Sequence, residues 1–158
     1  MYFLIGLHAG LGELGALAFL WVVIEMMNPT EGRVRRATKV ACFGVIALFL
    51  SWLAGGYYYL TNYQAMVKNL IKGGPYPWAH SVITETKEHV FMFLPFLAIV
   101  VWGALKQYGI VLINDDKKSL GKSIMLLAAF IFILAFLMAG MGYLISSGAR
   151  SALEQKIL

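Results

Sequence analysis

Four long stretches of apolar residues leave this 158-residue chain little choice of fold. A stretch of about 20 apolar residues can cross a bilayer as an α-helix, which satisfies its own backbone hydrogen bonds. Hydrophobic residues make up 60% of the chain and charged residues 13%, unlike the composition of a soluble domain. We therefore expect an all-α integral membrane protein, a single membrane domain over residues 1–158 folded as an up-down four-transmembrane-helix bundle. The stretches predict helices over about 2–25, 39–62, 82–107 and 121–147.

The basic residues of the connections predict how the bundle is oriented. Residues 33–39 and 106–122 each carry four Lys or Arg, against five in the rest of the chain. Cytoplasmic loops are enriched in Lys and Arg, so we expect the first and third loops inside and both termini on the outer side. An outer loop of about 61–82 follows, with prolines and paired glycines that interrupt a helix. We expect a prokaryotic cytoplasmic (inner) membrane, whose lipid explains the net charge of +5 without a nucleic-acid partner.

Two histidines, His8 and His89, fall at similar depths in different predicted helices. The helical rise of about 1.5 Å per residue places both about 5–10 Å below the outer surface. Ionisable residues in a membrane span usually face the bundle interior, a pathway or a cofactor. Two facing neutral imidazoles are the arrangement that ligates haem iron axially. We therefore predict that His8 and His89 are the metal ligands of one b-type haem near the outer face.

Glycines and charged residues complete the predicted cofactor site. Glycine occurs at the depth of the histidines in the other helices, where it leaves room for a flat ligand or for close helix packing. Lys68 and Arg150 are expected near the outer surface, where they can pair with haem propionates. Glu13 and Glu85 are expected either beside a quinol headgroup or on a proton route, or pinned to a neighbouring polar group. The predicted cofactor-binding residues are Gly12, Gly55, Gly56, Gly140, Glu13, Glu85, Lys68 and Arg150.

The same residues allow other interpretations. The two histidines can instead hydrogen-bond inside the bundle, with Glu13 or Glu85 as partner. Together with these two carboxylates they also make a ligand set for a non-haem metal. His80 is expected to be a loop residue near the surface, although a role as a substitute ligand or in proton exchange stays open. The single Cys42 lies in an apolar stretch, so no disulfide or thiolate metal site is expected.

The four spans, with His8, His89 and their flanking glycines, resemble the small four-helix cytochrome b subunits of membranes. The resemblance covers nearly the whole chain at the level of architecture. It implies a respiratory-chain electron-transfer subunit with one haem b, which exchanges electrons between quinone and an outer-side redox partner. Such a subunit is a redox carrier more than a stand-alone enzyme. The stretch Glu31–Ala37 is also similar to one in membrane glutathione-transferase-like proteins, but Val40–Phe43 lacks the polar residues expected after it.

Two further functions remain open at the level of sequence. The chain can be a non-catalytic accessory or anchor subunit of a larger membrane complex, with its polar residues serving helix packing. It can also be a proton or ion relay subunit that uses Glu13, Glu85 and His89. A carrier should be coloured, an accessory subunit colourless and co-purified with partners, and a relay colourless but active in ion flux.

Overall fold

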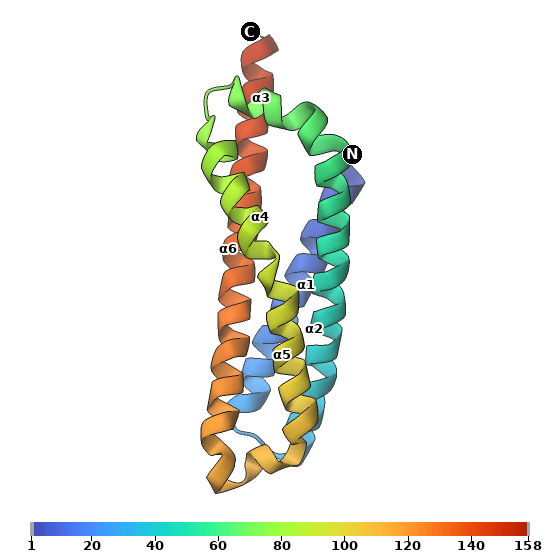
Figure 1. The fold of residues 1–158 in the computed structure, drawn as a ribbon, viewed down its shortest axis with the longest axis vertical. Helices are drawn as coiled ribbons and strands as arrows, with labels where there is room; N and C mark the ends of the chain where they lie inside the picture. Colours follow the sequence, from blue (N-terminus) through green and yellow to red (C-terminus); the bar gives the residue numbers. More distant parts are fainter. Residues whose placement is uncertain (1, 158) are drawn as a thin grey trace.

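The structure, a computed structural model, describes residues 2–157, and every element assigned in that range is helical (Figure 1). Four helical stretches are long and apolar enough to cross a membrane, as the sequence predicts. These stretches are Phe3–Met27, Glu31–Lys72, Ala79–Ile113 and Asp115–Ile157. The elements in chain order are α1 (Tyr2–Met27), α2 (Glu31–Tyr58), the π-helical η1 (Tyr59–Val67), α3 (Lys68–Lys72), the π-helical η2 (Ala79–Thr84), α4 (Glu85–Phe91), α5 (Phe93–Tyr108), the 3-10 turns η3 (Gly109–Ile113) and η4 (Asp115–Lys117), and α6 (Lys118–Ile157).

The second, third and fourth helical stretches extend further than the sequence predicts. Most of the region expected as an outer loop is helical, and only the segment between Lys72 and Ala79 is not. At the other end, α2 begins at Glu31, because the Thr30 hydroxyl accepts a hydrogen bond from the Arg33 amide at 3.4 Å. Turn residues therefore fix the true ends of the helices, whereas hydropathy locates only their middles.

A proline explains the break between α4 and α5. Pro95 has no amide hydrogen to bond to the carbonyl one turn earlier, and its ring crowds that carbonyl. The carbonyl belongs to Phe91, the last residue of α4, and α5 resumes at Phe93. At its far end α5 stops at Gly109, whose positive φ of 47° is a conformation that glycine adopts readily.

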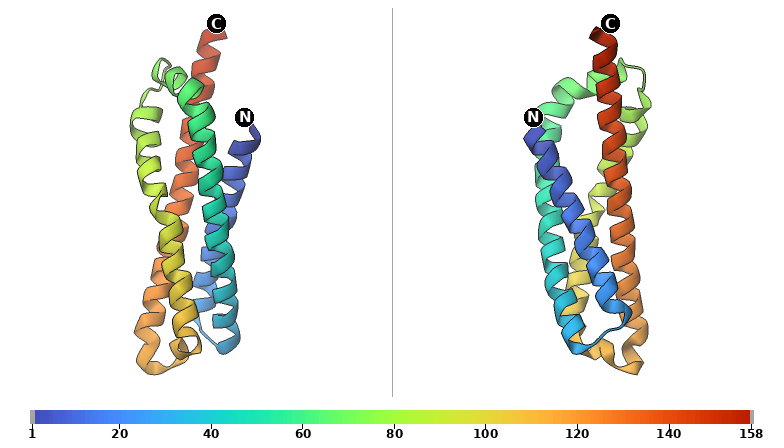
Figure 2. Two further views of the ribbon diagram at one scale, coloured as in Figure 1. Left: turned by 45° about the vertical axis from the view of Figure 1, so that its right-hand side comes forward. Right: turned by 180° about the vertical axis from the view of Figure 1, so that it is seen from behind.

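The bundle has a basic end and a loop end. The basic end holds the turn before α2 and the turns η3 and η4, and the loop end holds the segment between Lys72 and Ala79. Figures 1 and 2 show α1 and α2 side by side along the bundle, whereas near the loop end α2 stands apart from α4 and α6 and is joined to them by η1 and α3. The first and last described residues both lie toward the loop end.

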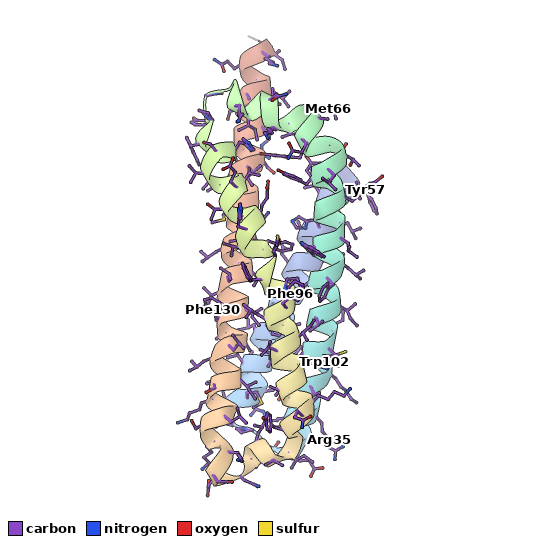
Figure 3. The ribbon with its side chains drawn as sticks, in the orientation of Figure 1. Arg35, Tyr57, Met66, Phe96, Trp102 and Phe130 are labelled. Carbon is purple, nitrogen blue, oxygen red and sulfur yellow. The ribbon has the colours of Figure 1, made fainter. Side chains whose placement is uncertain are left out.

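The bundle is longer than a bilayer is thick. The 40 residues of α6 extend about 60 Å at 1.5 Å per residue, whereas a hydrocarbon core is about 30 Å thick. A core of that thickness covers about 20 residues of each helix. Counted from Arg36 on α2, a core of this thickness reaches the exposed Tyr57, which Figure 3 labels. Counted from Lys122 on α6, it reaches the exposed Tyr143. An aromatic belt is expected at this level. On this placement the loop end projects beyond the hydrocarbon core.

The apolar core fills the half of the bundle toward the basic end. Its largest members are fully buried, and small residues let α1 and α2 approach closely. A Cβ added at Gly15 would lie 2.7 Å from Leu48, and one at Gly44 would lie 2.8 Å from Phe19. The largest fully buried core side chains are Phe19, Leu48, Leu94, Leu105, Leu112 and Ile131.

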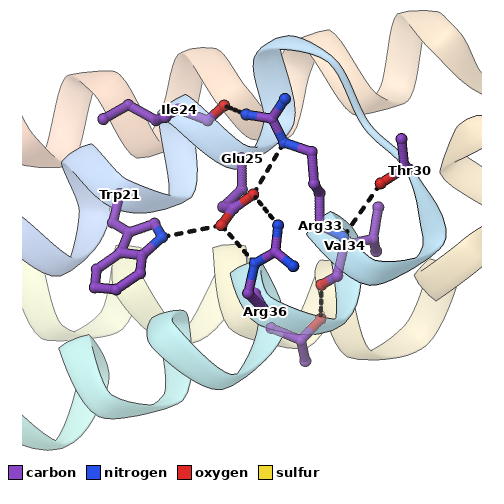
Figure 4. Close-up of polar contacts among 8 residues, drawn as sticks. Trp21, Ile24, Glu25, Thr30, Arg33, Val34 and Arg36 are labelled. Carbon is purple, nitrogen blue, oxygen red and sulfur yellow. Dashed lines mark hydrogen bonds and ion pairs between the residues drawn. The ribbon is translucent and has the colours of Figure 1, made fainter.

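A buried carboxylate joins α1 to α2 at the basic end (Figure 4). Glu25 is 6% exposed and accepts hydrogen bonds from Trp21 Nε1 at 3.0 Å, Arg33 Nε at 3.0 Å and Arg36 Nε at 2.8 Å. Arg33 also donates to the carbonyl of Ile24 at 2.6 Å. Both oxygens of the carboxylate are thus neutralised, and the connection between the helices is held by charge-assisted hydrogen bonds. Sequence reasoning assigned Glu25 no such role.

Candidate functional site

His8 lies half-buried between α1 and α2, where its ring is held by Ser51. The Nδ1 atom is 2.9 Å from the Ser51 carbonyl and 3.0 Å from the Ser51 hydroxyl, which itself donates to the His8 carbonyl at 2.7 Å. Because a carbonyl only accepts, Nδ1 carries the hydrogen and a neutral His8 has a bare Nε2. Gly55 makes the arrangement possible, since a Cβ there would lie 2.6 Å from Nδ1.

His89 lies at the depth of His8 but points away from it. The Phe91 ring contacts the His8 ring at 5.4 Å between centroids, which places this turn of α4 beside His8. His89 precedes Phe91 by two residues, about 200° around an α-helix, so its side chain is on the opposite face. It is exposed, and its Nδ1 donates to the Glu85 carbonyl at 2.6 Å. The structure therefore does not bring the two predicted haem ligands face to face, and the haem itself stays a prediction.

The other predicted cofactor residues are spread over the molecule. Gly12 faces the Ser51 hydroxyl, whereas added Cβ atoms at Gly56 and Gly140 would meet nothing within 4 Å. Lys68 donates to Gln64 Oε1 at 3.3 Å. Arg150 is exposed, donates to Ser147 at 3.1 Å and lies over the Tyr143 ring. Glu13 is exposed on α1, as Glu85 is on α4.

Metal-ligating side chains are not gathered in one place. Within residues 2–157 no group of three or more His, Cys, Asp or Glu side chains is placed to hold a metal ion. The alternative ligand set of two histidines and two carboxylates is therefore not assembled in this arrangement. Its members Glu13 and His89 point outward, from α1 and α4 respectively, while His8 points toward α2.

A cluster of polar side chains lies near the loop end, and the sequence did not predict it. It consists of Tyr63, His80, Thr84, Glu85 and Glu88, and the two π-helical segments η1 and η2 supply its centre. π-helical turns are rare and occur often at functional sites. His80 is 2% exposed, so the expectation of a surface loop residue is corrected: the η2 turn directs its ring inward against Tyr63. The spacing of His80, Thr84 and Glu88, four residues apart on one helical face, was a signal available in the sequence.

The hydrogen bonds of the polar cluster fix the tautomer of His80. Thr84 Oγ1 donates to the carbonyl of Ala79 at 2.9 Å, which uses its single hydrogen. The Tyr63 hydroxyl, 2.8 Å from Thr84 Oγ1, must then donate to it. Tyr63 can therefore only accept from His80 Nδ1, at 3.0 Å. The hydrogen of a neutral His80 is on Nδ1, and its Nε2 presents a bare lone pair.

Nε2 of His80 has no hydrogen-bond partner, although it is buried. The nearest acidic atom is Glu85 Oε1 at 4.0 Å, on a side chain that is 58% exposed. Glu88 Oε1 is also buried without a partner. Glu88 lies close to the Tyr59 hydroxyl and within electrostatic range of Tyr63 and His80. The polar cluster thus combines an unprotonated base, an exposed carboxylate beside it and a second carboxylate with unused acceptor capacity.

Lys87 is a further polar residue on α4, between the polar cluster and the level of His8. Lys87 is half-buried, and its amine packs against Gly142 of α6, 2.9 Å from where a Cβ would lie. No carboxylate lies within 4.0 Å of that amine among residues 2–157. Lys87 is within electrostatic range of His8. Beyond this level the core toward the basic end is apolar, with Leu94, Ala98 and Val101 fully buried.

The fold and the polar cluster define the chain as all-helical, with four candidate membrane spans and a buried, hydrogen-bonded histidine near one end. No family model, no curated protein and no solved structure matches this chain. The comparisons therefore assign the chain to no family, and the resemblance to cytochrome b subunits stays a prediction from the sequence.

Proposed function

We propose that this chain is a membrane subunit that takes up and releases protons at its outer side through the polar cluster. The bare, buried Nε2 of His80 is the observation that carries the proposal. A buried polar atom without a partner is rare in proteins and calls for an explanation, such as a catalytic role or a bound water or ion. In this proposal the loop end faces outward, because the basic end fits the cytoplasmic side of a membrane.

The proton route follows from the contacts of His80. Glu85 is exposed and its carboxylate is 4.0 Å from Nε2, so it can collect a proton and pass it to the imidazole. The resulting imidazolium keeps its Nδ1–H bond to Tyr63 and gains an ion pair with Glu85, with Glu88 also in range. Because the described core between the level of His8 and Glu25 is apolar, the proposed route serves one side of the membrane only. Such a site fits a subunit that supplies or accepts protons for chemistry in a larger complex.

Nuclear magnetic resonance of the protein labelled with ¹⁵N-histidine, in lipid nanodiscs, tests this proposal. At neutral pH we expect a His80 signal with the hydrogen on Nδ1 and a bare Nε2, which becomes protonated as the pH falls. Glu85→Gln should reduce the protonated fraction at a given pH, because it removes the negative charge beside Nε2. His89→Ala serves as the matched control and should leave the His80 signal unchanged. A His80 with its hydrogen on Nε2, or one that does not titrate, would overturn the proposal.

Electron transfer through one b-type haem is a second candidate, which the geometry of His8 favours. Histidines that bind metals usually donate their second ring nitrogen to a carbonyl or carboxylate, as His8 does to Ser51 and His89 does to Glu85. Both would then offer Nε2 to iron, once α4 turned to bring His89 inward. Quinone and an outer-side redox protein would be the exchange partners of such a subunit.

A reduced-minus-oxidised visible spectrum, with haem quantified as its pyridine complex, tests the second candidate. A low-spin b-type spectrum that is lost in both His8→Ala and His89→Ala variants would support it. His80→Ala is the control and should retain the spectrum. A colourless purified protein would exclude this function and leave proton exchange or an accessory role.

A further inference from the structure

One face of α1 carries glycines and a carboxylate but packs against nothing. Gly6, Gly10, Glu13 and Leu17 follow one another at helical spacing, so they lie within a narrow stripe. All four are exposed, and Leu17 is 50% exposed. A Cβ added at Gly6 or Gly10 would meet no atom within 4 Å. We call this stripe the glycine face; within the single chain these glycines have no packing role.

Glu13 is the residue of the glycine face whose unpaired carboxyl group would be energetically costly inside a membrane. It lies twelve residues from Glu25, about 18 Å along the helix, and therefore near the middle of a hydrocarbon core about 30 Å thick. It forms no hydrogen bond or ion pair with any other residue between 2 and 157. Ionisable side chains within a span almost always face a protein interior and pair with another polar group. In a membrane, another polypeptide on the glycine face would supply the partner for Glu13 that lipid does not offer.

We propose that the glycine face is the interface between two copies of this chain, related by a two-fold axis along the membrane normal. Glycines four residues apart, as Gly6 and Gly10 are, let two helix backbones approach closely. A two-fold axis brings residues of equal depth together, so that Glu13 meets Glu13 of the second copy. Two carboxyl groups that share one proton form a hydrogen bond, because the protonated one donates and the ionised one accepts. Each glycine and each carboxyl group thus finds its complement in its own counterpart.

The composition of the face favours a second copy over a different subunit. The glycine face contains no basic residue. Its member Leu17 is an exposed apolar side chain, and the exposed Ile24 extends the face by two turns. A two-fold interface requires such a self-complementary patch, with small residues against small residues and a shareable proton between the acids. A different subunit would instead have to bring its own buried Lys or Arg to Glu13. That arrangement is the competing outcome of the experiment.

Disulfide crosslinking in native membranes tests the interface directly. The chain's own cysteine is first removed by Cys42→Ala, and a single cysteine is then introduced by Gly10→Cys. We expect oxidation to give a covalent dimer of this variant. Phe130→Cys, at an α6 position that is 52% exposed and outside the glycine face, is the matched control and should stay monomeric. Absence of a crosslinked dimer for Gly10→Cys, or equal crosslinking of both variants, would overturn the proposal.

Dimer affinity in lipid, measured by fluorescence transfer between labelled copies, supplies a second readout. Glu13→Leu should weaken the dimer about threefold or more, the size of a typical interhelical hydrogen bond in a membrane. Gly10→Leu should weaken it further because its side chain separates the backbones. Both positions face outward, so the variants should fold normally. A wild-type chain that stays monomeric in lipid, or that is recovered with a different subunit bearing a basic residue and loses it in Glu13→Leu, would overturn the proposal.

Discussion

Single residues control the histidine environments, and Gly55 does so most directly for His8. A Cβ at this position would lie 2.6 Å from His8 Nδ1, so the ring must move and lose its bonds to Ser51. We expect Gly55→Ala to lower the free energy of unfolding by about 1–3 kcal/mol, the usual cost of overpacking. Gly56→Ala is the matched control, because nothing lies within 4 Å of its added Cβ. Reversible unfolding in detergent, followed by circular dichroism, compares the two; equal effects would contradict this account of Gly55.

Tyr63 sets the tautomer of His80, and the removal of one oxygen tests that role. Tyr63→Phe leaves His80 Nδ1–H without its acceptor and Thr84 without its donor. We expect the ¹⁵N spectrum to show a mixture of His80 tautomers and the stability to fall by about 1–3 kcal/mol. Tyr57→Phe, on a side chain that is 61% exposed, should change neither quantity. A single, unchanged tautomer in Tyr63→Phe would mean that another group orients the ring.

Among the structural elements, the connection between α1 and α2 depends on one buried ion-pair group. Glu25→Gln removes the charge that Arg33 and Arg36 share, so we expect a loss of about 2–3 kcal/mol in stability. Glu31→Gln is the control, because its ion pair with Arg35 is exposed on both sides and contributes about 0.5 kcal/mol or less. Thermal unfolding of both variants measures the difference. Similar losses in the two variants would show that burial gives Glu25 no special weight.

The helices also show which parts of the fold and of the candidate site can be predicted from the sequence. Length and hydropathy decide that four helices can span a membrane, because no other use of such apolar stretches satisfies the backbone. Helical rise alone placed His8 and His89 at one depth, and the contact between His8 and Phe91 agrees with it. Depth does not determine which face of α4 turns inward, however, and that depends on packing against α6. The burial of His80 depends in the same way on a partner from another element, because the hydroxyl that bonds its ring belongs to Tyr63 of η1.

At the scale of the whole molecule, the length of the bundle and its basic end predict a position in the membrane. Met66 is 57% exposed at the loop end, whereas Lys117 is exposed at the basic end and Phe130 lies between them (Figure 3). In a Cys42→Ala background, we expect a membrane-impermeant maleimide to label Met66→Cys in intact cells and Lys117→Cys only in inverted vesicles. Phe130→Cys should resist labelling from both sides, because it lies within the hydrocarbon core.

This labelling pattern decides what the polar cluster can do. If Met66→Cys reacts from outside, the proton exchange proposed for the polar cluster would take place with the outer compartment, since Met66 in η1 and Glu85 at the start of α4 both lie toward the loop end. If it reacts only in inverted vesicles, the basic residues do not orient the chain and the same chemistry faces the cytoplasm. If the maleimide labels Phe130→Cys, membrane insertion itself is contradicted, because the midpoint of α6 would then be in contact with water. Such labelling would also remove the reason for Glu13 to need a partner, since water would then solvate its carboxylate.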